Sequence, residues 1–229
     1  MKIVRIIAQW LFILCLPVLL LTASISGAMN CRWLYQYGFN KYDISRVTGL
    51  APEELKKAAD GLIHYFNSGD EYINVTVIKD GQPFVLFNER EAAHLKDVKG
   101  LFRLVYKALL GALIYTLLYI GVTWARRQDR RRLAQGLVFG GGLTLLLMLV
   151  LGLVIAFDFD QFFLEFHLLS FANDFWQLNP ATDYLLMMFP DGFWFDATLF
   201  IALGTGGMAL ILGGVGWWRL RKDRALQSP

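Results

Sequence analysis

The residues of this chain best suited to move a proton are two histidines that have carboxylates nearby. His94 follows Glu91 and precedes Asp97 by three residues, and residues three apart lie on the same face of a helix. Histidine changes its charge near neutral pH, so a histidine beside a carboxylate is a typical general acid or base. This spacing makes His94 the first candidate catalytic residue.

The second histidine, His167, stands at the edge of an aromatic stretch. Asp160 and Asp174 each lie seven residues from it, which on one helix is about 10.5 Å, so neither can contact the ring along that helix. A carboxylate partner must come from Glu165 bending back, from beyond the helix end, or from the segment around Glu91 and Asp97. We therefore expect His94 and His167 to face each other across one lipid-accessible cleft. The third histidine, His64, lies within an expected soluble helix, and we assign it a structural role.

Composition places these residues in a membrane protein. The 229 residues are 56% hydrophobic with a mean hydropathy of +0.44, above the level of soluble domains. The net charge of +3 is small. No long basic stripe lies outside the membrane flanks, which argues against nucleic-acid binding. Two cysteines are too few for a disulfide framework.

Four apolar runs are long enough to cross a hydrocarbon core about 30 Å thick: residues 6–28, 104–124, 133–157 and 195–218. Lys and Arg concentrate at residues 2–5, in the short loop 125–132 and in the tail 219–229, which predicts that these parts are cytoplasmic. The loops 29–103 and 158–194 then face outward. Residues 1–229 form one integral membrane domain, although the first run could instead be a signal peptide because Ser26-Gly27-Ala28 resembles a cleavage site.

The first outer loop is long enough to fold into a small α+β subdomain. A helix is expected from Pro52 to about Asn67, where Gly69 would end it. Residues 72–79 alternate in the manner of a strand, and a turn at 80–81 should lead into a second strand over 83–87. The fold class is therefore mainly α, with four transmembrane helices and a helix packed on a β-hairpin.

Three further features concern the outer ends of the spans. Asn88 and Glu91 resemble a capping box, so a helix should begin there and continue into the second span. Arg103 and Lys107, one turn apart, either snorkel or bind lipid phosphate. Phenylalanines at helical spacing over residues 159–166 predict an interfacial helix in the second outer loop.

Two runs in these outer segments are similar to the signature regions of a known family. They are NEREAAHLKDVK at residues 88–99 and FHLLSFANDFWQLNPATDYLLMMFP at residues 166–190. They resemble a bacterial family of four-span integral membrane proteins, long described as a domain of unknown function, that includes the lipoprotein intramolecular transacylases. In topology the resemblance covers nearly the whole chain.

The resemblance implies a membrane acyltransferase of the bacterial cytoplasmic membrane whose active site lies on the outer face. The reaction would move the sn-2 acyl chain of a diacylglyceryl-cysteine lipoprotein to the α-amine of that cysteine, giving a lyso-form lipoprotein. The family's two essential histidines correspond to His94 and His167, with Glu91, Asp97 and Asp174 as supporting carboxylates. Diacylated lipoproteins and membrane lipids are the expected partners, and no cofactor is expected.

This chemistry agrees with what the residues offer. An α-amine with a pKa of about 7.7 to 8.0 loses its proton readily to a histidine, and no nucleophile motif is evident. Our interpretation takes His94 as the base, oriented by Asp97 or Glu91, and His167 as the donor of a proton to the glycerol oxygen. The candidate oxyanion donors are Asn173, Trp176 and Arg103.

Two other functions remain open at this level. A metal-dependent membrane hydrolase could use the two histidines with Asp97 and Asp174, although no recognised metal motif is present and we assign no metal ligand. A non-catalytic protein that binds lipid or lipoprotein would not need either histidine.

Overall fold

The computed structural model describes residues 2–126 and 130–225. Arg127, in the expected basic loop, and residues 226–229 of the expected tail lie outside the described residues. The chain divides into two compact units, one of residues 1–26, 105–157 and 200–229 and the other of residues 27–104 and 158–199. We call them the apolar unit and the polar unit.

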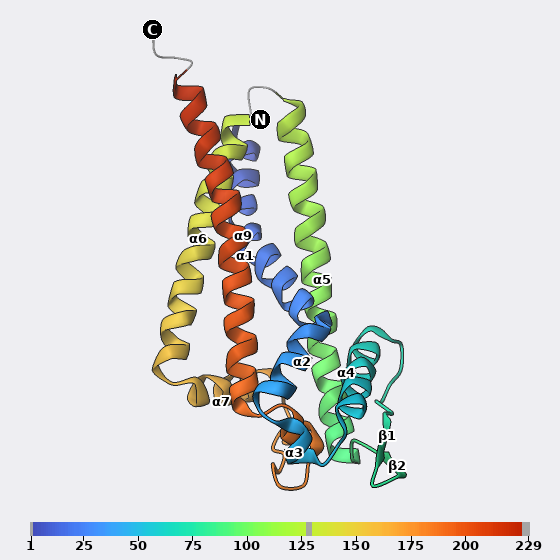
Figure 1. Cartoon of the computed structure of the whole chain (residues 1–229). Coiled ribbons are helices and arrows are strands. Elements are labelled where there is room, and N and C mark those ends of the chain that lie inside the picture. Colours follow the sequence, from blue (N-terminus) through green and yellow to red (C-terminus); the bar gives the residue numbers. More distant parts are fainter. Residues whose placement is uncertain (1, 127–129, 226–229) are drawn as a thin grey trace. The chain divides into compact units, whose positions relative to one another are not determined.

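Four helices in the described ranges are long and apolar enough to cross a membrane. They are α1 (Lys2–Asn30), α5 (Glu89–Ala125), α6 (Arg130–Phe157) and α9 (Asp191–Ala225) (Figure 1). Together with one two-stranded sheet, they confirm the expected fold class of a mainly α membrane protein with a small α+β part. The prediction that the helix at Glu89 runs without a break into the second apolar run is also confirmed, because α5 is a single helix of 37 residues.

Small residues bring α6 and α9 close together within the apolar unit. A Cβ atom added to Gly141 would lie 2.9 Å from the backbone oxygen of Ala209, and one added to Gly216 would lie 2.7 Å from that of Ala134. Both distances are shorter than real Cβ contacts, so any larger residue would push the helices apart. The two helices therefore approach closely at these two positions, whereas a Cβ at Gly142 or Gly214 would meet nothing within 4 Å.

In the polar unit, α4 (Pro52–Asn67) packs against a β-hairpin of β1 (Thr76–Lys79) and β2 (Gln82–Val85) (Figure 1). The helix spans the predicted residues and has proline in its first turn. Asp80 and Gly81 have positive φ angles of 51° and 76°, as a tight hairpin turn requires. Ile73, Val75 and Val77 are all buried on one side, as their alternation predicts.

Two local predictions in this unit were wrong. Gly69 does not end α4, because Ser68 is the C-cap, in an extended conformation. The first strand begins at Thr76 and not at residue 72, because the register starts with Thr76 opposite Val85. Alternation continues before the strand, but only one further backbone bond, from the Leu86 N–H to the Val75 oxygen at 2.9 Å, extends the pairing.

The remaining elements of the polar unit were not all expected. The interfacial helix predicted over residues 159–166 exists as α7 (Phe159–Ser170), and the Asp158 side chain caps it by accepting from the Gln161 N–H. The short helices α2 (Arg32–Lys41), α3 (Ile44–Thr48) and α8 (Tyr184–Met188) were not predicted. Lys41 and Tyr42 bond to Asp196 and so attach α2 to the first turns of α9.

Candidate active site

The two candidate histidines come together within the polar unit. His94 lies in the second turn of α5 and His167 in the last turn of α7, and their ring centroids are 6.1 Å apart with an angle of 30° between the ring planes. These residues are far apart in the sequence. The structure therefore supplies the proximity that proton transfer to and from one substrate would need.

Aromatic rings surround this pair. Phe171 contacts both imidazoles, with its ring centroid 5.0 Å from that of His94 and 5.6 Å from that of His167. Phe163 and Trp176 lie 4.4 Å and 5.0 Å from His167. Aromatic walls exclude water and strengthen the electrostatic interactions of any group held between them.

A backbone contact selects the tautomer of His167. Its Nδ1 lies 2.8 Å from the carbonyl oxygen of Phe163, one turn earlier on α7. A carbonyl oxygen can only accept, so we assign the hydrogen to Nδ1. Burial lowers the pKa of His167, and the Phe163 carbonyl acts in the opposite direction. In the neutral ring the lone pair is then on Nε2, which makes this nitrogen a proton acceptor.

His94 is more deeply buried, at 7% exposure. It lies in the polar first part of α5, before the apolar run that begins at Leu104. Burial and, to a smaller extent, a positive charge on His167 lower the pKa of His94 to about 4, and the charge of Asp97 opposes both. Among the described residues, its Nδ1 has no hydrogen-bond partner. A buried polar atom without a partner is a place where a bound molecule can contribute the missing contact.

Glu91 does not orient His94 as the sequence had suggested. Its carboxylate, 1% exposed, accepts the backbone N–H of Asn88 and that of Leu185, each at 2.7 Å. The Asn88 side chain in turn accepts from the Glu91 N–H at 3.0 Å, which confirms the predicted capping box. Burial raises the pKa of Glu91, and the backbone N–H groups oppose this. Glu91 therefore attaches the segment around Leu185 to the start of α5.

Asp97 and Asn173 are hydrogen-bonded to each other, with the Asn173 amide donating to Asp97 at 2.9 Å. The Asn173 side-chain oxygen accepts from the Phe175 N–H, so both ends of this amide are occupied in the loop. No hydrogen bond joins Asp97 to His94 in the described part of the chain. Asp97 acts on His94 through its charge alone.

The other predicted residues fall in different places. Asp174 has an exposed carboxylate and contributes its backbone oxygen, which accepts from Arg90 at 2.7 Å. Trp176 lies against His167. Arg103 is exposed and lines a pocket of the polar unit that Asp97 and Phe171 also line, whereas Lys107 belongs to the apolar unit.

Sequence reasoning missed Phe163 and Phe171 as neighbours of the histidines. For Phe163 a signal was present, since it precedes His167 by one helical turn. Phe171 follows the end of α7, where helical periodicity no longer applies. As for the metal alternative, no three His, Cys, Asp or Glu side chains within residues 2–126 and 130–225 are grouped so that they could hold an ion.

Comparison with known proteins concerns the fold and the family of this chain. An uncharacterised protein of Aquifex aeolicus (strain VF5) is 27% identical over 187 residues, which cover 78% of this chain and 82% of that protein. The structure of the membrane integral lipoprotein intramolecular transacylase Lit from Bacillus cereus superposes with a TM-score of 0.86 at 20% identity, covering 98% of this chain and all of that one. A variant of the same protein with one histidine replaced by arginine gives a TM-score of 0.77, also at 20% identity, and covers 99% of this chain and 96% of its own.

The family assignment comes from the sequence itself. The model of the lipoprotein intramolecular transacylase Lit family matches residues 10–194, which include both histidines and every part of the polar unit except residues 195–199. Since the match covers well over half of the chain, this protein belongs to the lipoprotein intramolecular transacylase Lit family of membrane enzymes.

Proposed function

We propose that this protein moves the acyl chain at the glycerol sn-2 position of a diacylglyceryl-cysteine lipoprotein to the α-amine of the same cysteine. A bond forms between the amine nitrogen and the ester carbonyl carbon, and the bond from that carbon to the glycerol oxygen breaks. One proton leaves the amine and one joins the glycerol oxygen, so no water or co-reactant is consumed. The observation that carries the proposal is the histidine pair enclosed by Phe163, Phe171 and Trp176.

His167 is the proton carrier in this proposal. The Nδ1–H bond to Phe163 leaves the lone pair on Nε2, and the lowered pKa keeps this ring neutral and ready to accept. Once protonated by the amine, the same ring can donate to the departing glycerol oxygen. This reverses the roles expected from the sequence, in which His94 was the base.

His94 has a different role because it stays neutral. With a pKa of about 4, it carries a proton in only about one molecule in a thousand at pH 7, so it is a poor source of protons. A neutral imidazole still has one N–H, which can donate to the negative oxygen that develops on the ester carbonyl. The buried, unpartnered Nδ1 supports a contact with bound substrate.

The position in the membrane is part of the proposal. Arg219, Arg221, Lys222 and Arg224 follow the last apolar run, and Arg130 to Arg132 precede the third. Cationic residues of this kind are retained on the cytoplasmic side. Both termini then lie in the cytoplasm, and the polar unit with its histidines lies on the outer face of the bacterial cytoplasmic membrane, where diacylated lipoproteins would reach it.

The test uses purified full-length protein and a synthetic diacylated lipopeptide. Intramolecular transfer leaves the mass of the lipopeptide unchanged, removes its primary amine and makes one acyl chain resistant to mild alkali. Hydrolysis would instead release a fatty acid and lower the mass. Mass spectrometry with fragmentation, together with an amine assay, separates the two reactions.

The variants are His94→Ala and His167→Ala, with His64→Ala as the matched control because His64 is the remaining histidine and is exposed. We expect transfer to fall by about 100-fold or more in the first two variants and to be unchanged in the control. If either active-site variant transfers the chain at the wild-type rate, or if fatty acid is released, the proposal is wrong. The first of these results would favour a protein that binds lipoprotein without using these residues.

A further inference from the structure

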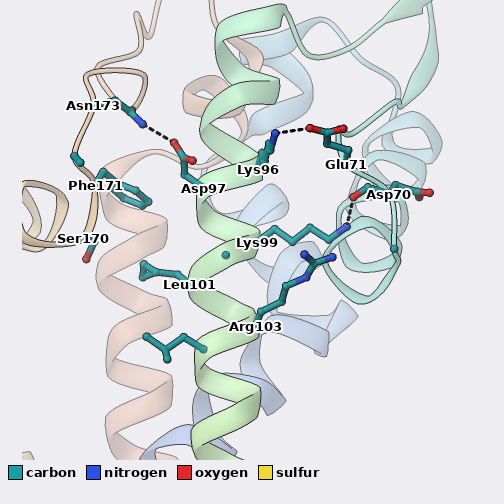
Figure 2. A pocket seen from close by; sticks show the side chains of 14 residues that line it. Asp70, Glu71, Lys96, Asp97, Lys99, Leu101, Arg103, Ser170, Phe171 and Asn173 are labelled. Carbon is teal, nitrogen blue, oxygen red and sulfur yellow. Dashed lines mark hydrogen bonds and ion pairs between the residues drawn. The ribbon is translucent and has the colours of Figure 1, made fainter.

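A pocket of about 700 Å³ opens within the polar unit on the side of α5 that carries Lys96, Lys99 and Arg103. Its other walls are the segments 69–71 and 170–173 (Figure 2). Its lining includes both charged residues and the apolar side chains of Leu101, Leu104 and Phe171. A pocket with both kinds of wall suits a molecule that has a charged group and an apolar tail.

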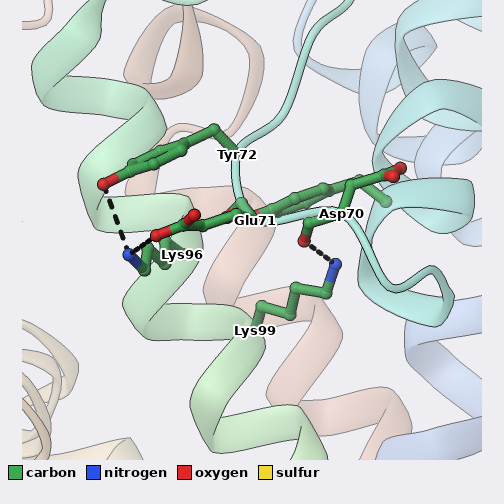
Figure 3. A network of polar contacts seen from close by, with 6 residues as sticks. Asp70, Glu71, Tyr72, Lys96 and Lys99 are labelled. Atoms are coloured by element: carbon green, nitrogen blue, oxygen red, sulfur yellow. Dashed lines mark hydrogen bonds and ion pairs between the residues drawn. The ribbon is translucent and has the colours of Figure 1, made fainter.

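Most of the charged groups in the lining already have partners. Lys96 donates to Glu71 at 2.6 Å and to the Tyr72 hydroxyl at 3.3 Å (Figure 3). Asp97 accepts from Asn173 at 2.9 Å. The charge of Lys96 is therefore paired with that of Glu71, and Asp97 is held by a neutral amide.

Lys99 is held in a different way. It is 2% exposed, and its ammonium group donates to the backbone oxygen of Asp70 at 2.7 Å and to the Ser68 hydroxyl at 3.2 Å. It also lies 4.0 Å above the ring of Tyr65. The Asp70 carboxylate points away from Lys99 (Figure 3). The ammonium is therefore fixed in place by neutral acceptors, and its positive charge is not cancelled by a bonded carboxylate.

Arg103 lies one turn further along α5 and lines the same pocket. It is exposed, and within the described ranges its guanidinium has no hydrogen bond or ion pair. Its positive charge acts on Lys99, whose pKa is lowered first by burial and then by Arg103, while the more distant charge of the Asp70 carboxylate opposes both. Two cations on successive turns that repel each other favour an anion between them.

We propose that Lys99 and Arg103 bind the phosphate group of a glycerophospholipid. Guanidinium groups bind phosphate oxygens in a fork, and a lysine contributes a point charge. Leu101 and Leu104 also line this pocket, and they provide the apolar surface that an acyl chain needs and that inorganic phosphate would not use. The sequence had paired Arg103 with Lys107, but Lys107 does not line this pocket.

The experiment measures lipid binding to the full-length protein in detergent by native mass spectrometry. The three probes are phosphatidylglycerol, diacylglycerol with the same acyl chains, and inorganic phosphate. The variant is Arg103→Gln, and the matched control is Lys107→Gln, which removes one positive charge from an exposed position of the same helix outside the pocket. No lipoprotein is present, so the result does not depend on the proposed transfer reaction.

We expect phosphatidylglycerol to bind more tightly than diacylglycerol, and Arg103→Gln to weaken its binding by about 10-fold while Lys107→Gln does not. Equal binding of diacylglycerol would overturn the proposal, because the phosphate would then make no contribution. Equal weakening by Lys107→Gln would also overturn it, since only the general charge of the helix would matter. Binding of inorganic phosphate but not of the lipid would show that the source is free phosphate and would refute the lipid assignment.

Discussion

Replacing Glu91 tests how the loop that carries Leu185 is held at the start of α5. The buried carboxylate accepts two backbone N–H groups, one from Asn88 just before its own helix and one from Leu185 in α8. Glu91→Gln keeps one acceptor oxygen but places an amide NH₂ against the other N–H. Glu91→Ala removes both acceptors and leaves two N–H groups without partners in a buried place.

The expected cost follows from the number of bonds lost. A hydrogen bond to a charged group contributes about 1.5 to 3 kcal/mol. Only the bond to Leu185 joins Glu91 to this loop, so Glu91→Ala should weaken the attachment of the loop by about 1.5 to 3 kcal/mol and Glu91→Gln by no more than that. Since about 1.4 kcal/mol is a factor of ten, the Ala variant should speed opening of this loop by about 10- to 150-fold.

Hydrogen exchange of the full-length protein measures this opening directly, because the Leu185 N–H is itself an exchanging group. The informative peptides cover residues 182–188. Glu89→Gln is the matched control, since Glu89 is an exposed glutamate in the same helical turn. Unchanged exchange over residues 182–188 in Glu91→Ala would refute the reasoning, and equal acceleration by Glu89→Gln would show that the helix end and not this contact is responsible.

Three other results are expected. Burial lowers the pKa of His167, so its neutral form persists as pH falls. The acid limb of kcat for lipopeptide transfer should therefore lie below pH 6.5, about the ordinary pKa of histidine. An acid limb at or above that value would contradict the assignment. Trp176→Ala should lower kcat about 10-fold by loosening His167, whereas Phe175→Ala, at an exposed neighbour without a ring contact to His167, should not. In thermal unfolding, Gly216→Leu should destabilise the protein by about 1 to 3 kcal/mol through overpacking. Gly214→Leu should have little effect, because an added Cβ there meets open space. Equal losses of stability in the two variants would contradict this explanation.

Much of the local structure followed from the sequence because its causes are local. Proline at the start of α4 and the Asp80–Gly81 turn depend on φ angles that these residues prefer. The capping box of Asn88 and Glu91 is completed within three residues. Such features depend on residues close in the sequence and not on contacts with distant segments.

Contacts between distant segments were not predictable in this way. Short helices such as α3 and α8 contain too few residues for a periodic pattern. Which of their faces are buried depends on how the two helices pack against each other. The buried ammonium of Lys99 depends on Ser68 and Asp70, which belong to another part of the chain. Nothing in the run around Lys99 indicates those partners.

For the candidate site, the sequence by itself determined which residues could do the chemistry and on which helix each would lie. It also showed that the carboxylates of Asp160 and Asp174 could not contact the His167 ring along one helix, because helical geometry sets the distance between residues seven apart. The tertiary structure decided that His94 and His167 lie together, that Glu91 bonds to Leu185 and not to His94, and that the Phe163 carbonyl selects the His167 tautomer. The physical reason is that spacing along a helix is a property of the backbone, whereas burial and hydrogen-bond partners across a site depend on how separate segments pack.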